Sequence, residues 1–425
     1  MVALGLLRSG YLLTDTYWIK PLGAEALAGL GGAAFAWWMV HLACEVGGTG
    51  VHALVAQHEG AGRRDRIPAT VVQGAWLGLV FWAGLVALAS VGTGLYFDAL
   101  AFAPGSGERA LGQAWLFAAM VGSGTLALQI VFDAAFRGLG HTGTALKITA
   151  LTLVANFALD PVLIHGWGPA PELGIAGAAW ATAMSNAFGM VLGFSLLAAE
   201  GLRPRLERPA AAALAALAKI GGPISAGGVA FSLVYVALGR MINEFGSVHV
   251  GALGVGHRIE STAYLVCVGF GVGASTMVGQ HLGAGDVGKA RASAHASARL
   301  AALSMLPFSV AAFTLADPLS VLLADPATAA AASVYLRWQA PMWVFMAAEV
   351  SYQGAFSGSG HTVPAFAINL VGTLLRLPFA WLLAFPLGMG IDGIWLAIAL
   401  STGLKGLAMG GWFARGTWRR GVALS

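Results

Sequence analysis

"LVAQHEGAG" at Leu54–Gly62 has a close copy in "MVGQHLGAG" at Met277–Gly285, 223 residues further along the chain. Glycine-rich phrases of this kind have two common explanations: a loop that cradles a phosphate group, or one copy of a duplicated fold. A phosphate loop places its glycines between a strand and a helix and usually adds a Lys and a Ser or Thr. Neither copy has that lysine, so the surrounding sequence must decide.

The composition places the chain in a membrane. Of the 425 residues, 58% are hydrophobic and only 10% are charged, whereas soluble domains average about half apolar and about a quarter charged residues. Apolar segments fill the whole length, so a single anchor or signal peptide does not account for them. The net charge of +4 does not indicate a nucleic-acid partner, because membrane proteins concentrate Lys and Arg in cytoplasmic loops.

Continuous apolar runs favour helices over the alternating strands of a barrel. About 20 apolar residues cross the hydrocarbon core as a helix, which also satisfies its own backbone there. We therefore predict an all-α polytopic membrane protein with twelve transmembrane helices, at residues 1–19, 27–56, 69–97, 112–136, 145–165, 174–199, 214–242, 250–279, 292–322, 329–356, 363–385 and 390–412.

The loop charges predict the topology. With a cytoplasmic N-terminus, the basic residues at 63–66, 203–208 and 415–420 all fall inside, and the outer side holds little beyond Lys20 and Arg109. This asymmetry follows the positive-inside rule, so we expect both termini in the cytoplasm of a plasma (inner) membrane protein. The longest charged break lies near the middle. It predicts an N-terminal six-helix lobe at 1–199, a cytoplasmic linker at 200–213 and a C-terminal six-helix lobe at 214–425.

Three matched phrases support duplication. The glycine phrases align at an offset of 223, "AAFRGLGHT" at 134–142 matches "GAFSGSGHT" at 354–362 at 220, and "GIAGAAWATAMS" at 174–185 matches "GIDGIWLAIALS" at 390–401 at 216. The order is the same in both halves. Cys44 aligns with Cys267, and both lie in apolar runs, which predicts small buried residues rather than a disulfide or a metal site. The glycine phrases then mark the cytoplasmic ends of matching helices, and parallel repeats of this kind are typical of transporters.

The sequence also resembles a known family. The phrases "LTDTYWIKPLGAEALAGLG", "LVAQHEGAG", "FRGLGHT", "NFALDPVLI", "LGIAGAAWATAMS", "RIEST" and "MVGQHLGAG" are similar, in the same order, to those of the multidrug and toxic compound extrusion (MATE) transporters, in particular the bacterial DinF-like branch. The resemblance covers nearly the whole chain. It implies a two-lobe exporter that uses a proton or sodium gradient to expel organic, often cationic and amphipathic, compounds by alternating access.

Ionisable groups inside a membrane are costly, so each is a candidate functional residue. Asp15 lies at the position of the family's first-helix aspartate. Asn156 and Asp160 are four residues apart, which places them on one helix face, and they match the family's cation site; Thr182 adds a hydroxyl. We predict a cation-coupling site from these four residues, because two carboxylates with neutral oxygens can hold a proton or coordinate sodium. The structural alternative is that Asp160 ends a helix before Pro161.

Other charged residues are secondary candidates. Glu260 lies in the "RIEST" phrase, where an ion pair is as plausible as a role in transport. Glu349 lies about one turn from the family's tenth-helix aspartate. Glu45 is four residues from His41, and a packed hydrogen bond is the expected outcome. Arg240, Arg376 and Lys405 are expected to snorkel or pair.

Two other functions compete with the exporter. A lipid-linked oligosaccharide flippase would need a basic central cavity, and a membrane-embedded enzyme would need convergent catalytic residues, which the sequence lacks. Without an HExxH array we expect no catalytic metal. The prediction is therefore a non-enzymatic antiporter without a cofactor, coupled to H⁺ or Na⁺. Its expected partners are a small organic substrate and the lipid bilayer, with no nucleic acid, and it is expected to act as a monomer.

Overall fold

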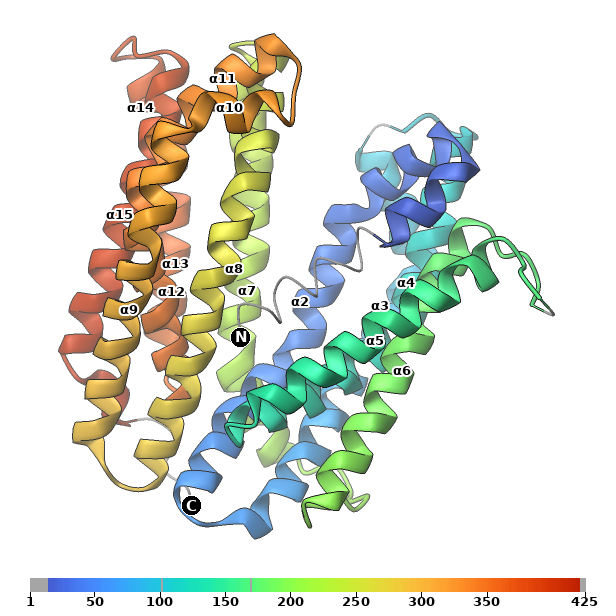
Figure 1. The fold of residues 1–425 in the computed structure, drawn as a ribbon, viewed down its shortest axis with the longest axis vertical. Helices are drawn as coiled ribbons and strands as arrows, with labels where there is room; N and C mark the ends of the chain where they lie inside the picture. Colours follow the sequence, from blue (N-terminus) through green and yellow to red (C-terminus); the bar gives the residue numbers. More distant parts are fainter. Residues whose placement is uncertain (1–13, 101, 169, 421–425) are drawn as a thin grey trace. The chain divides into compact units, whose positions relative to one another are not determined.

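The computed structural model describes residues 14–100, 102–168 and 170–420, and within them it contains helices and no β-strand (Figure 1). Residues 14–19 are helical and continue into η1 (Lys20–Leu22). The longer elements are α2 (Ala24–Gly60), α3 (Ile67–Ala99), α4 (Gly107–Gly138), α5 (Thr142–Ile164), α6 (Ile175–Ala199), α7 (Ala211–Asn243), α8 (Ser247–Gly283), α9 (Val287–Thr314), α10 (Ala316–Val321), α11 (Pro326–Gln339), α12 (Trp343–Gly358), α13 (Val363–Leu374), α14 (Arg376–Ala384) and α15 (Ile391–Ala414).

The described helices confirm a polytopic membrane protein. Ten helical segments of the described chain are long and apolar enough to cross a bilayer. The predicted span at 329–356 corresponds to α11 and α12, which are separated by the 3₁₀ turn η3 (Ala340–Met342). Pro341 explains this interruption, because proline lacks the N–H that an α-helix needs. Most of the predicted span at 1–19 lies outside the described residues.

Two other predicted spans are also broken. The span at 292–322 divides into α9 and α10, and the span at 363–385 divides into α13 and α14 at Leu375. Pro378 follows the second break. Its missing N–H leaves the carbonyl four residues earlier, at Leu374, without its helical donor. The α14 helix therefore begins at Arg376, which places this side chain within the membrane span.

The repeat is visible in the helix ends. Both α2 and α8 contain 37 residues, and each follows a glycine with positive φ, Gly23 and Gly246. At the other end, Gly62 and Gly285 have φ of 69° and 75°. Left-handed glycines of this kind close helix C-termini. The two glycine phrases are therefore matching helix stops, with the same backbone hydrogen bonds: Ala61 N to Gln57 O, and Ala284 N to Gln280 O.

The helices also pack in matching patterns. In the first half α4 packs against α2, α3 and α6, and in the second half α12 packs against α8, α9 and α15. Small residues permit the close approach of α8 and α12: a Cβ on Gly354 would collide with the backbone of Gly271, and one on Gly358 with the backbone of Ser275. Membrane helices commonly use small residues in this way, because lipid offers little hydrophobic drive for association.

The described chain divides into two compact units, an N-terminal unit up to Ser225 and a C-terminal unit from Ala226 onward. The division falls inside α7. Residues 202–210, before α7, have no regular structure, and α3 holds them: Gln73 Nε2 donates to the Arg208 carbonyl and Trp76 Nε1 donates to the Glu207 carbonyl. The predicted lobe and linker boundaries stay a prediction.

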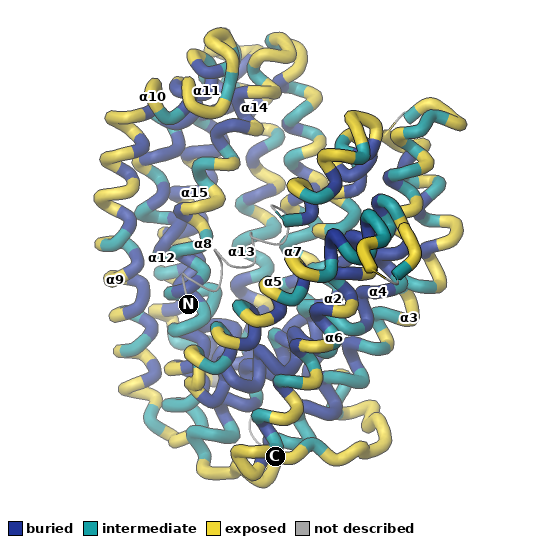
Figure 2. Tube along the Cα trace, turned by 45° about the vertical axis from the view of Figure 1, so that its right-hand side comes forward, coloured by how far each residue is buried: buried dark blue, intermediate teal, exposed yellow. Residues whose placement is uncertain are grey.

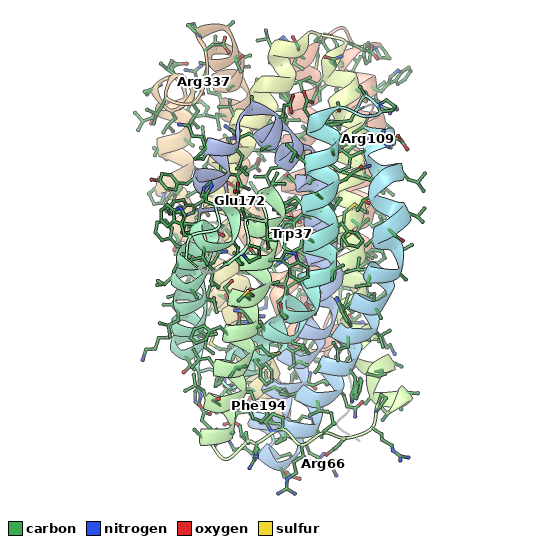
Figure 3. All side chains as sticks on the ribbon, turned by 90° about the vertical axis from the view of Figure 1, so that its right-hand side faces the viewer. Trp37, Arg66, Arg109, Glu172, Phe194 and Arg337 are labelled. Atoms are coloured by element: carbon green, nitrogen blue, oxygen red, sulfur yellow. The ribbon has the colours of Figure 1, made fainter. Side chains whose placement is uncertain are left out.

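Burial follows the expectation for a membrane protein. In the C-terminal unit, buried residues line the interior around α8 and α12, while α9 carries exposed residues on its outer side (Figure 2). In the N-terminal unit, Arg66 lies at one end, Arg109 lies toward the other, and Trp37 lies between them (Figure 3). Cys44 and Cys267 are buried free thiols, as predicted.

Candidate functional site

The four residues predicted for cation coupling lie together in the N-terminal unit. Asn156 is at the centre: its Nδ2 donates to Asp160 Oδ1 at 3.2 Å and lies 3.3 Å from Thr182 Oγ1. Its Oδ1 accepts a hydrogen bond of 2.9 Å from Thr14. The Asp15 side chain interacts with Asn156 and lies within electrostatic range of Asp160. Three separate segments, residues 14–19, α5 and α6, thus meet at what we call the acid cluster, made of Asp15, Asn156, Asp160 and Thr182.

The two carboxylates of the acid cluster are withdrawn from water. Asp160 is 0% exposed and Asp15 is 6% exposed. Among the described residues, no donor pairs with Oδ1 of Asp15 or Oδ2 of Asp160. A buried acceptor without a partner costs free energy, and two nearby carboxylates repel each other. The cluster therefore has both the charge and the free acceptor atoms for a cation.

Aromatic packing fixes the segment that carries Asp15. The Trp18 ring contacts Phe157 and Trp167, each at a centroid distance of 5.6 Å, and His165 Nε2 lies 3.1 Å from the Trp18 carbonyl. These contacts hold residues 14–19 against the end of α5. The α5 helix itself continues through Pro161 to Ile164. The alternative that Asp160 ends a helix before Pro161 is therefore wrong, because the helix continues past it. The Asp160 side chain faces the acid cluster.

The secondary candidates Glu349 and Glu260 lie in the C-terminal unit, and each has a partner. Lys405 Nζ of α15 lies 2.8 Å from Glu349 Oε1 of α12, and both side chains are less than a tenth exposed. Tyr335 donates a hydrogen bond of 2.9 Å to Glu260, whose carboxylate is also 4.0 Å from His257 Nε2. The expected pairing of Lys405 is confirmed. The partners of Glu260 are a tyrosine and a histidine rather than a lysine or arginine.

Arg376 has a buried hydrogen-bonding environment that the sequence analysis did not predict. It is 2% exposed and donates to three hydroxyl groups: Ser401 at 2.5 Å, Tyr235 at 2.9 Å and Thr402 at 3.1 Å. Its guanidinium also lies 5.6 Å from the centroid of the Phe231 ring, within cation–π range. A snorkelling side chain reaches water, whereas this one is enclosed. The available signal was the hydroxyl pair Ser401–Thr402, at the end of the α15 repeat phrase and directly after it.

Glu45 lies apart from these clusters, on α2. Its carboxylate is 3.7 Å from His41 Nε2, four residues earlier, and both side chains are about one-fifth exposed. The two side chains thus face each other on one side of the helix, as their i, i+4 spacing predicts, at an ion-pair distance rather than that of a hydrogen bond. No group of three or more His, Cys, Asp or Glu side chains in the described chain is arranged to hold a metal ion.

Comparison with known proteins gives a family match over both halves. The MatE family model matches residues 2–162 and again residues 223–382. The two matches correspond to the two copies of the repeat.

Relatives and solved structures agree with this match. A probable multidrug resistance protein NorM of Thermotoga maritima is 23% identical over 97% of this chain and 90% of its own. A protein of Shewanella oneidensis named as an FAD transporter is 27% identical over 94% and 89%. A solved MATE family transporter of the MOP superfamily, in an outward-facing conformation, superposes with a TM-score of 0.89 at 18% identity, covering 99% of this chain and 95% of that one.

The two matched sets of membrane helices therefore form the scaffold of a transporter rather than of an enzyme. One set contains the acid cluster, and the other contains the buried Arg376. The family model covers most of the chain in two colinear copies, and the fold is that of solved transporters of the same family. This chain is therefore a member of the MatE family of multidrug and toxic compound extrusion transporters.

Proposed function

We propose that this transporter exports organic, amphipathic or cationic compounds by antiport with H⁺ or Na⁺, and that the acid cluster binds the coupling cation. The observation that carries the proposal is the pair of buried carboxylates, Asp15 and Asp160, linked by Asn156. The multidrug resistance relative supports the choice of substrate class.

The coupling step follows from electrostatics. Without a cation, the two carboxylates repel each other in a low-dielectric interior. A bound cation removes this repulsion and pulls residues 14–19 toward α5 and α6, because the ligands come from all three segments. The cation thus favours one packing of these helices over another. If the organic substrate binds the opposite packing more tightly, cation entry and substrate release alternate.

Both coupling ions fit the available atoms. A proton on one carboxyl group creates an O–H donor for an oxygen that has no partner. Sodium is instead bound by oxygen ligands, as hard cations prefer, and Asn156 Oδ1 and Thr182 Oγ1 add neutral oxygens to the two carboxylates. The two ions make different experimental predictions, because only one gradient drives transport.

The test uses the full-length transporter in sealed vesicles, with either a pH gradient or a sodium gradient, and a panel of fluorescent organic cations. We expect one gradient to drive transport, and Asp15→Asn to reduce transport to the level of protein-free vesicles. Asp65→Asn is the matched control, since Asp65 is an exposed carboxylate of the same unit. Full coupled transport in Asp15→Asn would reject the acid cluster as the coupling site. Movement of a labelled lipid with no transport of the panel would favour a flippase instead.

A second substrate class is favoured by one observation. Arg376 is a buried cation that, within the described chain, donates hydrogen bonds to three neutral hydroxyls and lies beside the half-exposed ring of Phe231. This combination suits an aromatic anion, and one relative is named as an FAD transporter. Flavin adenine dinucleotide therefore belongs in the transport panel, followed by its own fluorescence. Gradient-driven flavin export that is lost in Arg376→Met would favour the anion over the cation class.

A further inference from the structure

A groove on the C-terminal unit combines an apolar lining with a single cation. It has a volume of about 580 Å³ and lies between α7 and α14, where Leu233, Val236, Leu377 and Trp381 line it and Arg240 adds a guanidinium. This volume is within the range of about 300–1,000 Å³ that is typical of small-molecule sites. Leu233 and Trp381 are each more than half exposed. The groove is therefore open at the surface of this unit.

Contacts at both ends of the groove hold the two helices in place. At one end Arg376 of α14 donates to Tyr235 of α7 at 2.9 Å. At the other end the rings of Phe245 and Phe385, which follow the two helices, lie 5.4 Å apart. The two helices thus run in the same direction, and most of the groove lining, Val236 to Met241 and Leu377 to Trp381, lies between these contacts. It is a fixed feature of the packing rather than a gap left by one side chain.

The chemistry of the groove changes with depth. Arg240 lies within the last turn of α7, which ends at Asn243, and Trp381 lies within the last turn of α14, which ends at Ala384. Leu233 and Leu377 lie further from these helix ends. In a membrane helix, Arg and Trp near the end lie at the headgroup level, and residues further in lie among the acyl chains. The groove therefore passes from a cationic, aromatic rim to an apolar interior.

Arg240 is available for a ligand. Its side chain is exposed, and in the described part of the chain no acceptor or carboxylate pairs with it. Glu244 is four residues later, yet among the described residues it forms no ion pair with Arg240. By contrast, other outer arginines are paired: Arg109 with Asp98, and Arg337 with Asp317 at 2.6 Å. A guanidinium at headgroup depth without a protein anion matches a phosphate group.

We propose that this groove is a binding site for an anionic phospholipid, with the headgroup phosphate on Arg240 and an acyl chain between α7 and α14. The observations that carry it are the position of the unpaired cation at the rim and the apolar lining below it. The site is independent of the acid cluster, which lies in the other unit. It assigns a structural lipid to the transporter, beyond its transported substrates.

The test measures lipid binding to the full-length protein in detergent by native mass spectrometry, with phosphatidylglycerol and phosphatidylcholine of identical acyl chains. We expect wild-type protein to retain phosphatidylglycerol preferentially. Arg240→Gln should weaken its binding about fivefold, from the usual contribution of one basic residue at an anionic headgroup, and leave phosphatidylcholine unchanged. Arg240→Lys should retain most of the preference.

Two further variants test the groove itself. Leu233→Trp fills the groove and should weaken the binding of both lipids. Val371→Trp, at an exposed position of α13 outside the groove, should weaken the binding of neither lipid. Equal binding of the two lipids to wild type, or unchanged phosphatidylglycerol binding in Arg240→Gln, would overturn the proposal. Binding of glycerol phosphate as tightly as the whole lipid would also overturn it, because the acyl chain would then contribute nothing.

Discussion

The two units share a backbone plan but differ in their buried charges. In the N-terminal unit, Asp15, Asn156 and Asp160 form an acidic centre in which one oxygen of each carboxylate, Oδ1 of Asp15 and Oδ2 of Asp160, has no donor among the described residues. At an offset of 220 from Asn156, the C-terminal unit has Arg376, which is hydrogen-bonded to three hydroxyls. Glu349 of the same unit is paired with Lys405. The first centre is thus short of positive charge, whereas the acids of the second have partners. Duplication preserved the glycines and helix ends, while the buried polar residues diverged.

Neutralising an acid of the N-terminal unit should cost transport rather than stability. We expect Asp160→Asn to reduce gradient-driven transport to the background of protein-free vesicles, because the proposed cation site loses one of its two carboxylates. The melting temperature in detergent should hold or rise, since the substitution removes like-charge repulsion. Transport assays and thermal unfolding on the same preparation check both expectations. Coupled transport at the wild-type rate would remove Asp160 from the site.

Neutralising an acid of the C-terminal unit should have the opposite result. Glu349→Gln leaves Lys405 as a buried charge without its carboxylate, which should lower the free energy of unfolding by about 3–5 kcal/mol. The double variant Glu349→Met/Lys405→Met should recover most of this loss, because it removes both charges. Denaturant unfolding in detergent measures the two effects. A single variant as stable as wild type would show that the ion pair does not stabilise this unit.

The matched glycine stops provide a test in which the units should behave alike. Gly62→Ala and Gly285→Ala force a side chain into a left-handed conformation, which costs about 1–2 kcal/mol. Both positions have open space around the missing Cβ, so the strain of the backbone is the whole effect. Thermal unfolding of the two variants should show similar losses. A large difference between them would mean that the two helix stops are not equivalent.

The smallest expected effect is a pH dependence of the helix cap at the start of α9, which directly follows the second glycine phrase. Asp286 caps α9 by accepting a hydrogen bond from the Lys289 N–H at 2.8 Å. Hydrogen bonds from the backbone and side chain of Lys289 hold the pKa of the Asp286 carboxyl below its usual value of 3.8. Because the pKa is lowered, the stabilisation of the folded state by the ionised Asp286 carboxylate is present at neutral pH. It is lost as the pH falls through this lowered pKa, below 3.8.

Hydrogen exchange in the peptide at residues 286–292 checks this expectation. Asp286→Ala should exchange faster than wild type at pH 6, and the difference between the two proteins should shrink as the pH falls below 3.8 and the wild-type carboxyl becomes protonated. Arg63 occupies the equivalent position of the first copy, so the start of α3 should show no matching change. Equal exchange of wild type and variant at pH 6 would contradict a stabilising cap.

Much of the fold could be predicted from the sequence because hydrophobic length and glycine position are local signals. The spans near α2 and α8, the glycine stops at Gly62 and Gly285, and the convergence of Asn156 with Asp160 all follow from spacing along one helix. The partners of Arg376 and Glu349 could not be predicted in this way. They come from other helices, and their contacts depend on packing that no single helix encodes. The helix break at Leu375, directly before Arg376, could be predicted only from Pro378, because this proline provides no N–H for the Leu374 carbonyl.

The length of α2 and α8 has a mechanical consequence. A helix of 37 residues is about 55 Å long, nearly twice the roughly 30 Å thickness of the hydrocarbon core. It acts as a stiff rod that extends beyond the core even when tilted. A rotation of about 5° around one end of such a rod displaces the other end by about 5 Å, roughly one helical turn. Angular changes too small to disturb the packing near the pivot can therefore become large movements at the glycine-capped ends.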